Sequence, residues 1–340
     1  MTAPNQRHQK VRNALAHLIS DGMGKNPFSP TLLRYCELIR TYDTACNRDR
    51  NGCVFAVYGR RKVGKSTLFN TIMGADVLPC KPIPATGSVI DLVRVNRPDY
   101  LVACKGKGEP LIRHCETPEE VRGFLEQCAG QKSPCDSVTV SGPFPDAADF
   151  VTDKCRLRDT PGAEAYLDNM DCALDERLKE DSAKALKSMR ETDCIPLFCL
   201  NAQEKEWARE SNLYAECFQT RSCLHVVTRI DTDSEDLSHP DVLRRVESCR
   251  QALKLPPSET VLKPIVCTGI QPATLKQKRV NIGYGDLVRE MQALIDPAKL
   301  GNTLCGVADY ILQCGRQGLD WEAGCGVDLF LRELECAMKS

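Results

Sequence analysis

The chain has 340 residues, a formal net charge of −1, and 42% hydrophobic and 27% charged residues, which is an ordinary globular balance. The near-neutral charge excludes a strongly basic protein of the kind that coats nucleic acid, and no apolar run reaches the roughly 18 residues of a membrane-spanning helix. The polar N-terminus has no signal-peptide core, so the sequence predicts a cytoplasmic protein.

Residues 1–50 are predicted to form an N-terminal helical neck segment. Apolar residues recur at helical spacing from Val11 to Ile19 and again from Leu32 to Ile39. The stretch NPFSP at 26–30 interrupts this pattern, so we expect two helices before the main domain.

From residue 51 to residue 295, short apolar strands alternate with amphipathic helices. Alternation of this kind predicts an α/β fold with a mostly parallel sheet and helices on both faces. Helical patterns occupy 117–128, 175–191 and 285–295. The C-terminal helical segment, 296–340, would join the N-terminal helices in a short neck. The predicted strands are 53–58, 88–95, 100–105, 136–142, 154–159, 194–200, 223–228 and 263–268.

Cysteine is unusually frequent, with 20 residues, yet the chain has no C-x-x-C pair and no spacing typical of a metal-ligand set. Many cysteines lie in apolar runs, for example Cys194 and Cys199 in CIPLFCL. We expect reduced thiols that fill the core. A redox or metal role for some of them stays open.

The stretch GRRKVGKS at 59–66 fits the phosphate-loop pattern G-x-x-x-x-G-K-[ST] in full. Its glycines allow backbone N–H groups to point at phosphate oxygens, and the helix that begins near Ser66 adds the positive end of its dipole. Lys65 is expected to reach the β- and γ-phosphates, and the Ser66 hydroxyl to bind Mg²⁺. The expected nucleotide-binding residues are Gly59, Arg60, Arg61, Lys62, Val63, Gly64, Lys65, Ser66 and Thr67.

A second motif, DTPG at 159–162, follows a predicted strand and fits D-x-x-G. Asp159 would hold Mg²⁺ through water, and the Gly162 N–H would contact the γ-phosphate. A plain turn is the alternative, because Asp, Pro and Gly are common turn residues. Its place downstream of a phosphate loop favours the nucleotide role.

A third motif, TRID at 228–231, also follows a predicted strand and resembles the [N/T]-K-x-D guanine motif of GTPases. Asp231 would accept hydrogen bonds from guanine N1–H and the 2-amino group, whereas adenine would leave this carboxylate unpaired. Arg229 stands where lysine is usual, and its aliphatic stem could lie along the base beside Thr228. Thr268 lies where backbone N–H groups could touch guanine O6. The motif favours GTP, and an acidic loop after a strand is the alternative.

Thr86 lies in PIPATGSVI, 20 residues after Ser66. GTPases need a threonine in this loop to bind Mg²⁺ and the γ-phosphate together, and hydrolysis then releases the loop. Thr86 is therefore a candidate metal ligand and catalytic residue. A simple proline-rich connection is the alternative.

In this order, the motifs resemble the dynamin-family GTPase domain in its bacterial dynamin-like form. The resemblance rests on GKSTLFNTIMG, VLPCKPIPATGSV and NIGYGDLVREMQALI and covers residues 50–295 in pattern. Thr86 and Asp159 are 73 residues apart, which leaves room for an inserted helix and at least one extra strand. The resemblance implies a P-loop NTPase three-layer αβα domain, GTP and Mg²⁺ as ligands, and a homodimer across the nucleotide face that orders the switch loops.

The sequence departs from the family pattern in two places. Only 45 residues follow residue 295, so a dynamin stalk and membrane remodelling are not expected, and a peripheral membrane contact stays open. In the phosphate loop, Arg61 and Lys62 replace the usual Gln or Ser. Either could swing onto the γ-phosphate as an internal finger, or both are solvated loop charges. Residue 163 is alanine, so no glutamine orients water from the position used in Ras-like enzymes.

The predicted function is hydrolysis of GTP to GDP and phosphate with Mg²⁺, stimulated by self-association. Lys65, with Arg61 or Lys62, would balance the developing charge. A regulatory GTPase of the ribosome-assembly type is one alternative, but its usual basic RNA-binding domain is not evident, and no nucleic-acid partner is expected. A non-hydrolysing nucleotide-dependent scaffold is the other, because the water-orienting glutamine is missing.

Overall fold

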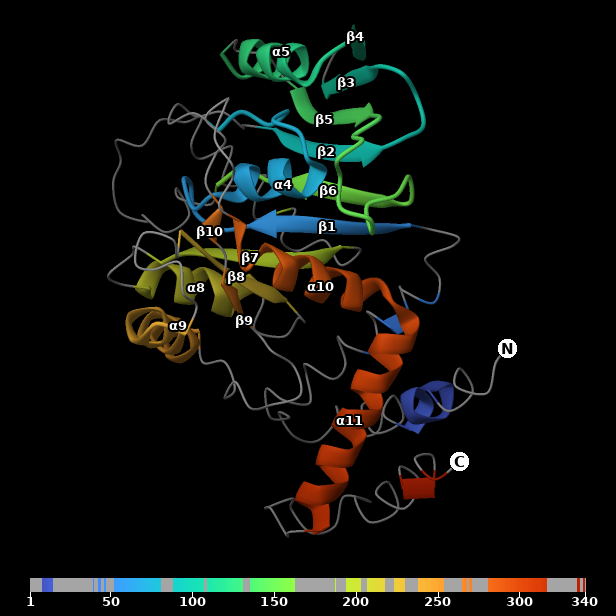
Figure 1. Ribbon diagram of the computed structural model, residues 1–340, viewed down its shortest axis with the longest axis vertical. Helices are drawn as coiled ribbons and strands as arrows, with labels where there is room; N and C mark the ends of the chain where they lie inside the picture. The colour runs from blue at the N-terminus through green and yellow to red at the C-terminus, as the bar shows by residue number, and fades with distance from the viewer. Residues whose placement is uncertain are drawn as a thin grey trace.

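The computed structural model is described here for residues 8–14, 39, 42–43, 46, 52–80, 88–106, 109–130, 135–162, 187, 194–202, 207–217, 223–229, 238–253, 265–267, 269–270, 281–316, 335–336 and 339. These residues contain a nine-stranded sheet in the order β4-β3-β5-β2-β6-β1-β7-β8-β9 (Figure 1). Its strands are β1 (Cys53–Tyr58), β2 (Val89–Arg94), β3 (Tyr100–Gly106), β4 (Leu111–Cys115), β5 (Cys135–Gly142), β6 (Cys155–Asp159), β7 (Ile195–Asn201), β8 (Leu224–Thr228) and β9 (Ile265–Cys267). A separate two-stranded sheet pairs β10 (Gly269–Ile270) with β11 (Asn281–Ile282).

The sheet has two parts, which we call the central strands and the outer strands. The central strands, β6, β1, β7, β8 and β9, are all parallel to one another. The outer strands are β2 to β5. There β2 runs antiparallel to β6 and parallel to β5, and β3 runs antiparallel to both β4 and β5. The mostly parallel α/β sheet predicted from the sequence is thereby confirmed.

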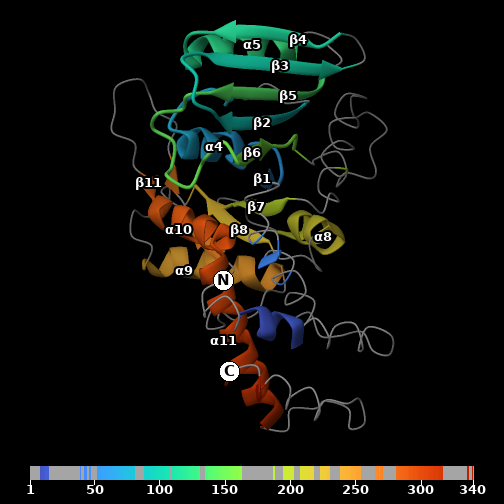
Figure 2. The same cartoon turned by 90° about the vertical axis from the view of Figure 1, so that its right-hand side faces the viewer.

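Helices cover both faces of this sheet, as the three-layer prediction requires. The helices are α4 (Lys65–Met73), α5 (Pro118–Gly130), α8 (Ala208–Cys217), α9 (Pro240–Ala252), α10 (Tyr284–Ile295) and α11 (Pro297–Arg316). Figure 2 shows α4 and α10 on one side of the sheet and α8 on the other.

Alternation along β1 explains why two separate cores form. Phe55 and Val57 join the core beneath α4, α5 and α10, whereas Ala56 and Tyr58 join the core beneath α8 and α9. Successive side chains of a strand point to opposite faces, so a strand covered on both faces must be apolar throughout. This is why CVFAVY reads as one continuous apolar run.

The predicted strands and helices within the described ranges are confirmed, and the structure adds β4, β10, β11, α8 and α9, which were not predicted. The strand β4, sequence LIRHC, was not predicted. Four of its five residues are exposed, so it has neither the continuous apolar run of a doubly covered strand nor a clear alternation. The predicted helix at 175–191 lies almost wholly outside the described residues.

Helices from the two ends of the chain lie together, away from the sheet. The helical residues 8–14 lie beside α11 in both ribbon views (Figures 1 and 2). The His8 ring packs so closely on Gly301 that a Cβ there would lie 2.1 Å from the His8 Nδ1. Arg12 pairs with Asp43 at 2.7 Å, and Val11 is fully buried. These contacts agree with a short neck, while the three domain boundaries, 1–50, 51–295 and 296–340, stay a prediction.

The cysteines whose side chains are described are reduced thiols, and in the same residues no group of side chains is suited to hold a metal ion. Cys194 and Cys199 are buried, as expected for core-filling residues. Burial raises the pKa of Cys199 to about 12, so this thiol stays protonated.

No helix within the described ranges combines the length and the hydrophobicity needed to cross a bilayer. The cytoplasmic location stays a prediction.

Candidate nucleotide-binding site

The phosphate loop links the end of β1 to the start of α4, the strand–loop–helix context that its motif requires. Gly59 has a φ of 139°, and a Cβ there would lie 2.5 Å from the Cys199 carbonyl oxygen, so only glycine fits. Gly64 has a φ of 95° and precedes α4 without a side-chain cap. The N–H groups of the first turn of α4 are therefore available to an anion.

Lys65 is held inside this loop by the loop's own backbone. Its side chain is 7% exposed, and its Nζ donates to the carbonyl oxygens of Gly59 at 3.1 Å and Arg60 at 2.7 Å. The loop therefore curls around a buried ammonium group. Such a charge, fixed next to free N–H groups, suits a polyphosphate.

Ser66 and Asp159 bring the first two motifs together. The Ser66 Oγ donates to the Asp159 Oδ2 at 2.7 Å, although the residues lie 93 positions apart. Asp159 is fully buried, and burial raises the pKa of its carboxyl group, opposed by Lys65 and by the Ser66 hydrogen bond. Its Oδ1 has no hydrogen-bond partner among the described residues. A buried carboxylate oxygen beside a hydroxyl fits the oxygen ligands that Mg²⁺ prefers.

The DTPG loop is pressed against the phosphate loop. A Cβ on Gly162 would lie 2.2 Å from Arg61 Cγ and 2.8 Å from Arg61 N. Thr160, to which the sequence gave no role, is fully buried and donates its hydroxyl to the Val57 carbonyl at 2.6 Å. This bond ties the DTPG motif to β1, the strand before the phosphate loop. Gly162 is thereby held in contact with Arg61.

The TRID motif also braces the phosphate loop, through two residues. The Thr228 Oγ1 lies 2.5 Å from the Val63 carbonyl oxygen and 3.0 Å from that of Leu200. Arg229 has a φ of 60°, and its Nη2 donates to the Lys62 carbonyl oxygen at 2.8 Å. The guanidinium of Arg229 therefore contacts the loop backbone, a role that the sequence did not suggest for this substitution.

Three expected site residues, Thr86, Asp231 and Thr268, lie outside the described residues, so their roles stay predictions. Arg61 is half-buried and Lys62 is exposed with a φ of 60°. The choice between an internal finger and a solvated charge stays open for both.

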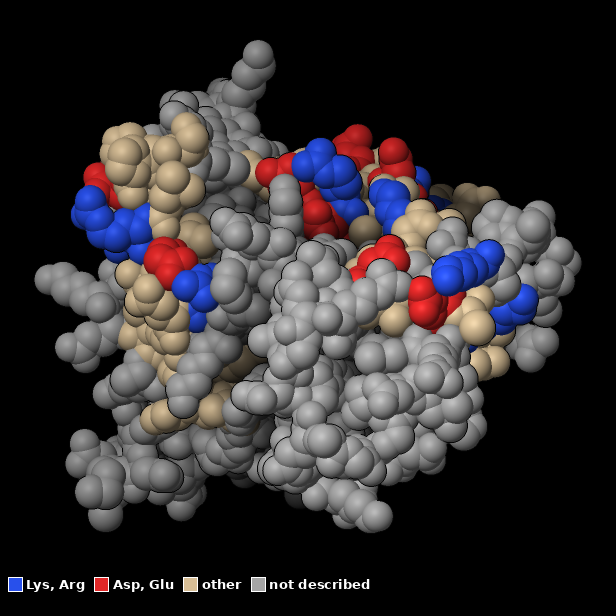
Figure 3. Space-filling model, turned by 90° about the horizontal axis from the view of Figure 1, so that it is seen from below, with Lys and Arg blue, Asp and Glu red and all other residues tan. Residues whose placement is uncertain are grey.

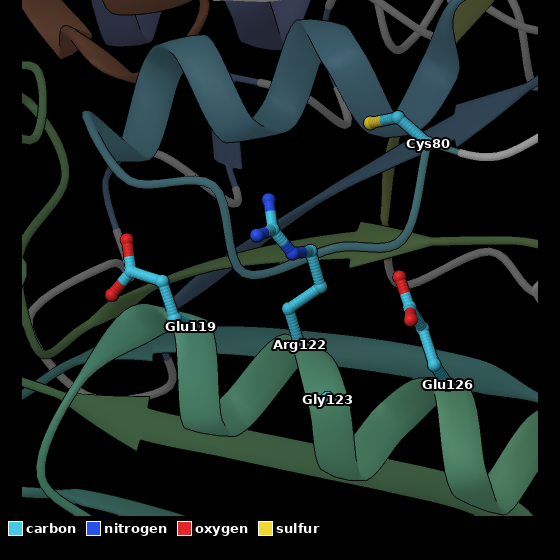
Figure 4. A pocket seen from close by; sticks show the side chains of 5 residues that line it. All are labelled: Cys80, Glu119, Arg122, Gly123 and Glu126. Carbon is cyan, nitrogen blue, oxygen red and sulfur yellow. The ribbon is translucent and has the colours of Figure 1, made fainter. Parts of the chain in front are cut away.

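A pocket of about 330 Å³ lies close to the start of α4 (Figure 4). Arg122 and two acidic side chains project into it from α5 and face Cys80 in the segment after α4. The Cys80 sulfur accepts from Thr67 Oγ1 at 3.6 Å and from Asn70 Nδ2 at 3.4 Å. The pocket is lined by Cys80, Glu119, Arg122, Gly123 and Glu126.

Residues 55–214 match the sequence model of the dynamin family. No curated protein matches the chain. Two solved structures of an oligomerised bacterial dynamin pair, described as a mechanism for the long-range sensing and tethering of membranes, each share 16% identity with it. They cover 89% and 92% of this chain, which spans 46% and 43% of theirs, with TM-scores of 0.49 and 0.47. The family match confirms the resemblance stated above.

Proposed function

We propose that the protein binds GTP with Mg²⁺ and hydrolyses it to GDP and phosphate, because residues 55–214 match the dynamin family. The observation that carries this proposal is the pair formed by Ser66 and Asp159, 2.7 Å apart beside the buried Lys65. The fully buried Asp159 carboxylate has one oxygen without a hydrogen-bond partner in the described part of the chain. A bound cation would satisfy that oxygen.

In this proposal, the phosphate loop positions the nucleotide and the DTPG loop completes the site. Backbone N–H groups from Gly59 to Ser66 surround the β-phosphate, and Lys65 moves from its two carbonyl partners to the β- and γ-phosphates. Ser66 would bind Mg²⁺ directly and Asp159 would bind it through water, and Thr86 would supply a further oxygen ligand. Mg²⁺ would neutralise charge that develops on the β- and γ-oxygens.

Hydrolysis is proposed to proceed by in-line attack of water on the γ-phosphorus, with cleavage of the bond to the β-phosphate oxygen. The Gly162 N–H would fix one γ-oxygen. Arg61 packs against Gly162, so its guanidinium could reach the same phosphate and offset the developing charge. Lys62 is the alternative cation.

The base would be guanine. Thr228 and Arg229 hold the phosphate loop from the side of the TRID motif, which supports placing Asp231 near the far end of the nucleotide. We propose that Asp231 accepts from the guanine N1–H and 2-amino groups and that a backbone N–H near Thr268 contacts O6.

We also propose that the domain self-associates across its nucleotide face. Residue 163 is alanine, so groups elsewhere must orient the attacking water, and a second copy could order them. A nucleic-acid partner is not proposed. On the face seen from below, the basic and acidic side chains of the described residues lie interspersed (Figure 3). A peripheral membrane contact through the neck would be a separate property and is not needed for GTP hydrolysis.

The direct test is phosphate release from GTP and from ATP, with Mg²⁺, over a range of protein concentrations and beside a Lys65→Ala control. GTP-specific turnover that rises per molecule with concentration is expected. Turnover independent of concentration would remove the self-association part, and turnover of ATP alone would contradict the role of Asp231. Tight GTP binding without turnover would indicate a nucleotide-dependent scaffold instead.

RNA and liposome co-sedimentation would separate a ribosome-assembly GTPase from a dynamin-like one.

A further inference from the structure

A buried ion pair connects the phosphate loop to α8. The Arg60 Nη1 lies 3.3 Å from the Glu210 Oε1 and donates to it, although the two residues are 150 positions apart in sequence. The Glu210 side chain is 1% exposed and that of Arg60 is 19% exposed. Buried acidic groups are rare unless they are paired, so the position of this carboxylate needs an explanation.

Arg60 is the loop residue that also holds Lys65. Its carbonyl oxygen accepts from Lys65 Nζ at 2.7 Å, the shorter of the two bonds that this ammonium makes to the loop backbone. The side chain of Arg60 thus points to Glu210 while its backbone points to Lys65. A shift of Arg60 would move the carbonyl that holds the phosphate-binding lysine.

Glu210 is fixed firmly enough to act as an anchor. It lies in the first turn of α8, where the helix dipole favours a negative charge. The same helix buries Leu213 and Tyr214 in the core beneath the sheet, and the Ser211 Oγ donates to the Ala252 carbonyl at the end of α9 at 2.7 Å. Glu210 therefore stands on an element held by packing and by a hydrogen bond.

We propose that Glu210 is a positioning residue for nucleotide binding: through Arg60 it fixes the phosphate loop in the form that receives the polyphosphate. The inference rests on the proposed function of the same site. Its effect should be equal for GDP and GTP, because the loop surrounds the phosphates that the two nucleotides share. It also keeps Arg60 directed away from the nucleotide, so Arg61 and Lys62 remain the candidates for a second cation, beside Lys65, at the γ-phosphate.

Simple electrostatic repulsion and the positioning role predict opposite changes in nucleotide affinity for Glu210→Gln. Glu210 is a buried negative charge close to an anion site, so simple repulsion would make Glu210→Gln bind nucleotide more tightly. If Glu210 acts by positioning, Glu210→Gln binds nucleotide more weakly, because a neutral amide holds the Arg60 guanidinium less firmly than a carboxylate does.

The test measures GDP and GTP affinity by equilibrium binding, and turnover at saturation, for Glu210→Gln, Arg60→Met and the double variant Arg60→Met/Glu210→Gln. Each single variant should weaken the binding of both nucleotides by about tenfold, the scale of one lost charge-assisted hydrogen bond. Glu210→Gln should change turnover at saturation less than about twofold. The double variant should lose no more than either single variant, about tenfold, because all three break the same contact. Asp99→Asn, which removes the charge from a pair of 2.9 Å between Arg97 and Asp99 in the turn between β2 and β3, is the control and should change neither quantity.

Failure of the positioning role of Glu210 can be distinguished from failure of GTP binding itself. Unchanged affinity in Glu210→Gln, or tighter binding, would overturn the positioning role while leaving GTP binding intact. Additive losses, about 100-fold in the double variant, would also overturn it, because the two residues would then act independently. Thermal unfolding of each variant identifies a purely structural loss, which lowers the melting temperature without weakening binding by the folded protein. A wild-type protein that binds no GTP would instead contradict the proposed function.

Discussion

The central and outer strands differ in how their residues are buried, and the candidate site lies almost wholly on the central ones. Every residue of β8 is buried, as is every residue of β7 except its last. By contrast, β3 and β5 alternate between buried and less buried positions, and β4 is exposed over four residues. Parallel strands covered on both faces form a rigid support, whereas strands with one covered face tolerate change on the other.

The site follows from this difference. Loops that leave β1, β6 and β8 carry the phosphate loop, DTPG and TRID, and the parallel arrangement brings the three strand ends to one edge. The outer strands supply the insertion between the expected switch threonine and Asp159. Changes in the central strands should therefore affect stability or activity strongly, and matched changes in the outer strands weakly.

The largest expected effect is on stability. Leu197 in β7 is fully buried, and Leu197→Ala should lower the free energy of unfolding by about 3 kcal/mol through lost burial and a cavity. Leu111 in β4 is 52% exposed, and Leu111→Ala should change it by less than about 0.5 kcal/mol. Denaturant unfolding followed by circular dichroism measures both. Similar losses would show that another surface covers β4.

The next effect is on turnover. Gly162→Ala would place a Cβ 2.2 Å from Arg61 Cγ and 2.8 Å from Arg61 N, so the DTPG loop and the phosphate loop must separate. A displacement of about 1 Å at a catalytic site lowers the reaction rate by about 100-fold, so GTP turnover should fall by that factor. The unfolding midpoint should change little, because the two loops can move apart. Full activity in Gly162→Ala would contradict the assignment of this loop to the γ-phosphate.

The central strands were also easier to predict from the sequence than the outer strands. The strands β1, β7 and β8 were predictable because double burial leaves unbroken apolar runs, and the phosphate loop because its chemistry fixes residues at short spacing. The exposed strand β4 has no such pattern. Contacts over long separations were also unpredictable: nothing in the sequence near Arg60 indicates Glu210, 150 positions away, and no motif assigns Thr160 its bond to Val57.

A smaller effect is expected where the TRID motif braces the loop. Thr228→Val keeps the shape of the side chain but removes the hydroxyl that lies between the Val63 and Leu200 carbonyls. Nucleotide affinity should fall by about tenfold, equivalent to about 1.4 kcal/mol. Thr139→Val, on the outer strand β5, should leave affinity unchanged. Equal affinities in the two variants would show that the Thr228 hydroxyl does not organise the phosphate loop.

The smallest effect is a gain in the outer part of the molecule. Gly123 lies inside α5, and a Cβ there would meet no atom within 4 Å. Glycine in a helix interior costs about 0.5–1 kcal/mol relative to alanine, so Gly123→Ala should raise the free energy of unfolding by that amount and leave GTP turnover unchanged. Gly285→Ala is the matched control, because its Cβ is equally unobstructed but lies in the first turn of α10, where the gain should be smaller. Reduced turnover in Gly123→Ala would contradict the separation of the two regions, since Gly123 lines the pocket that adjoins Cys80 and Thr67.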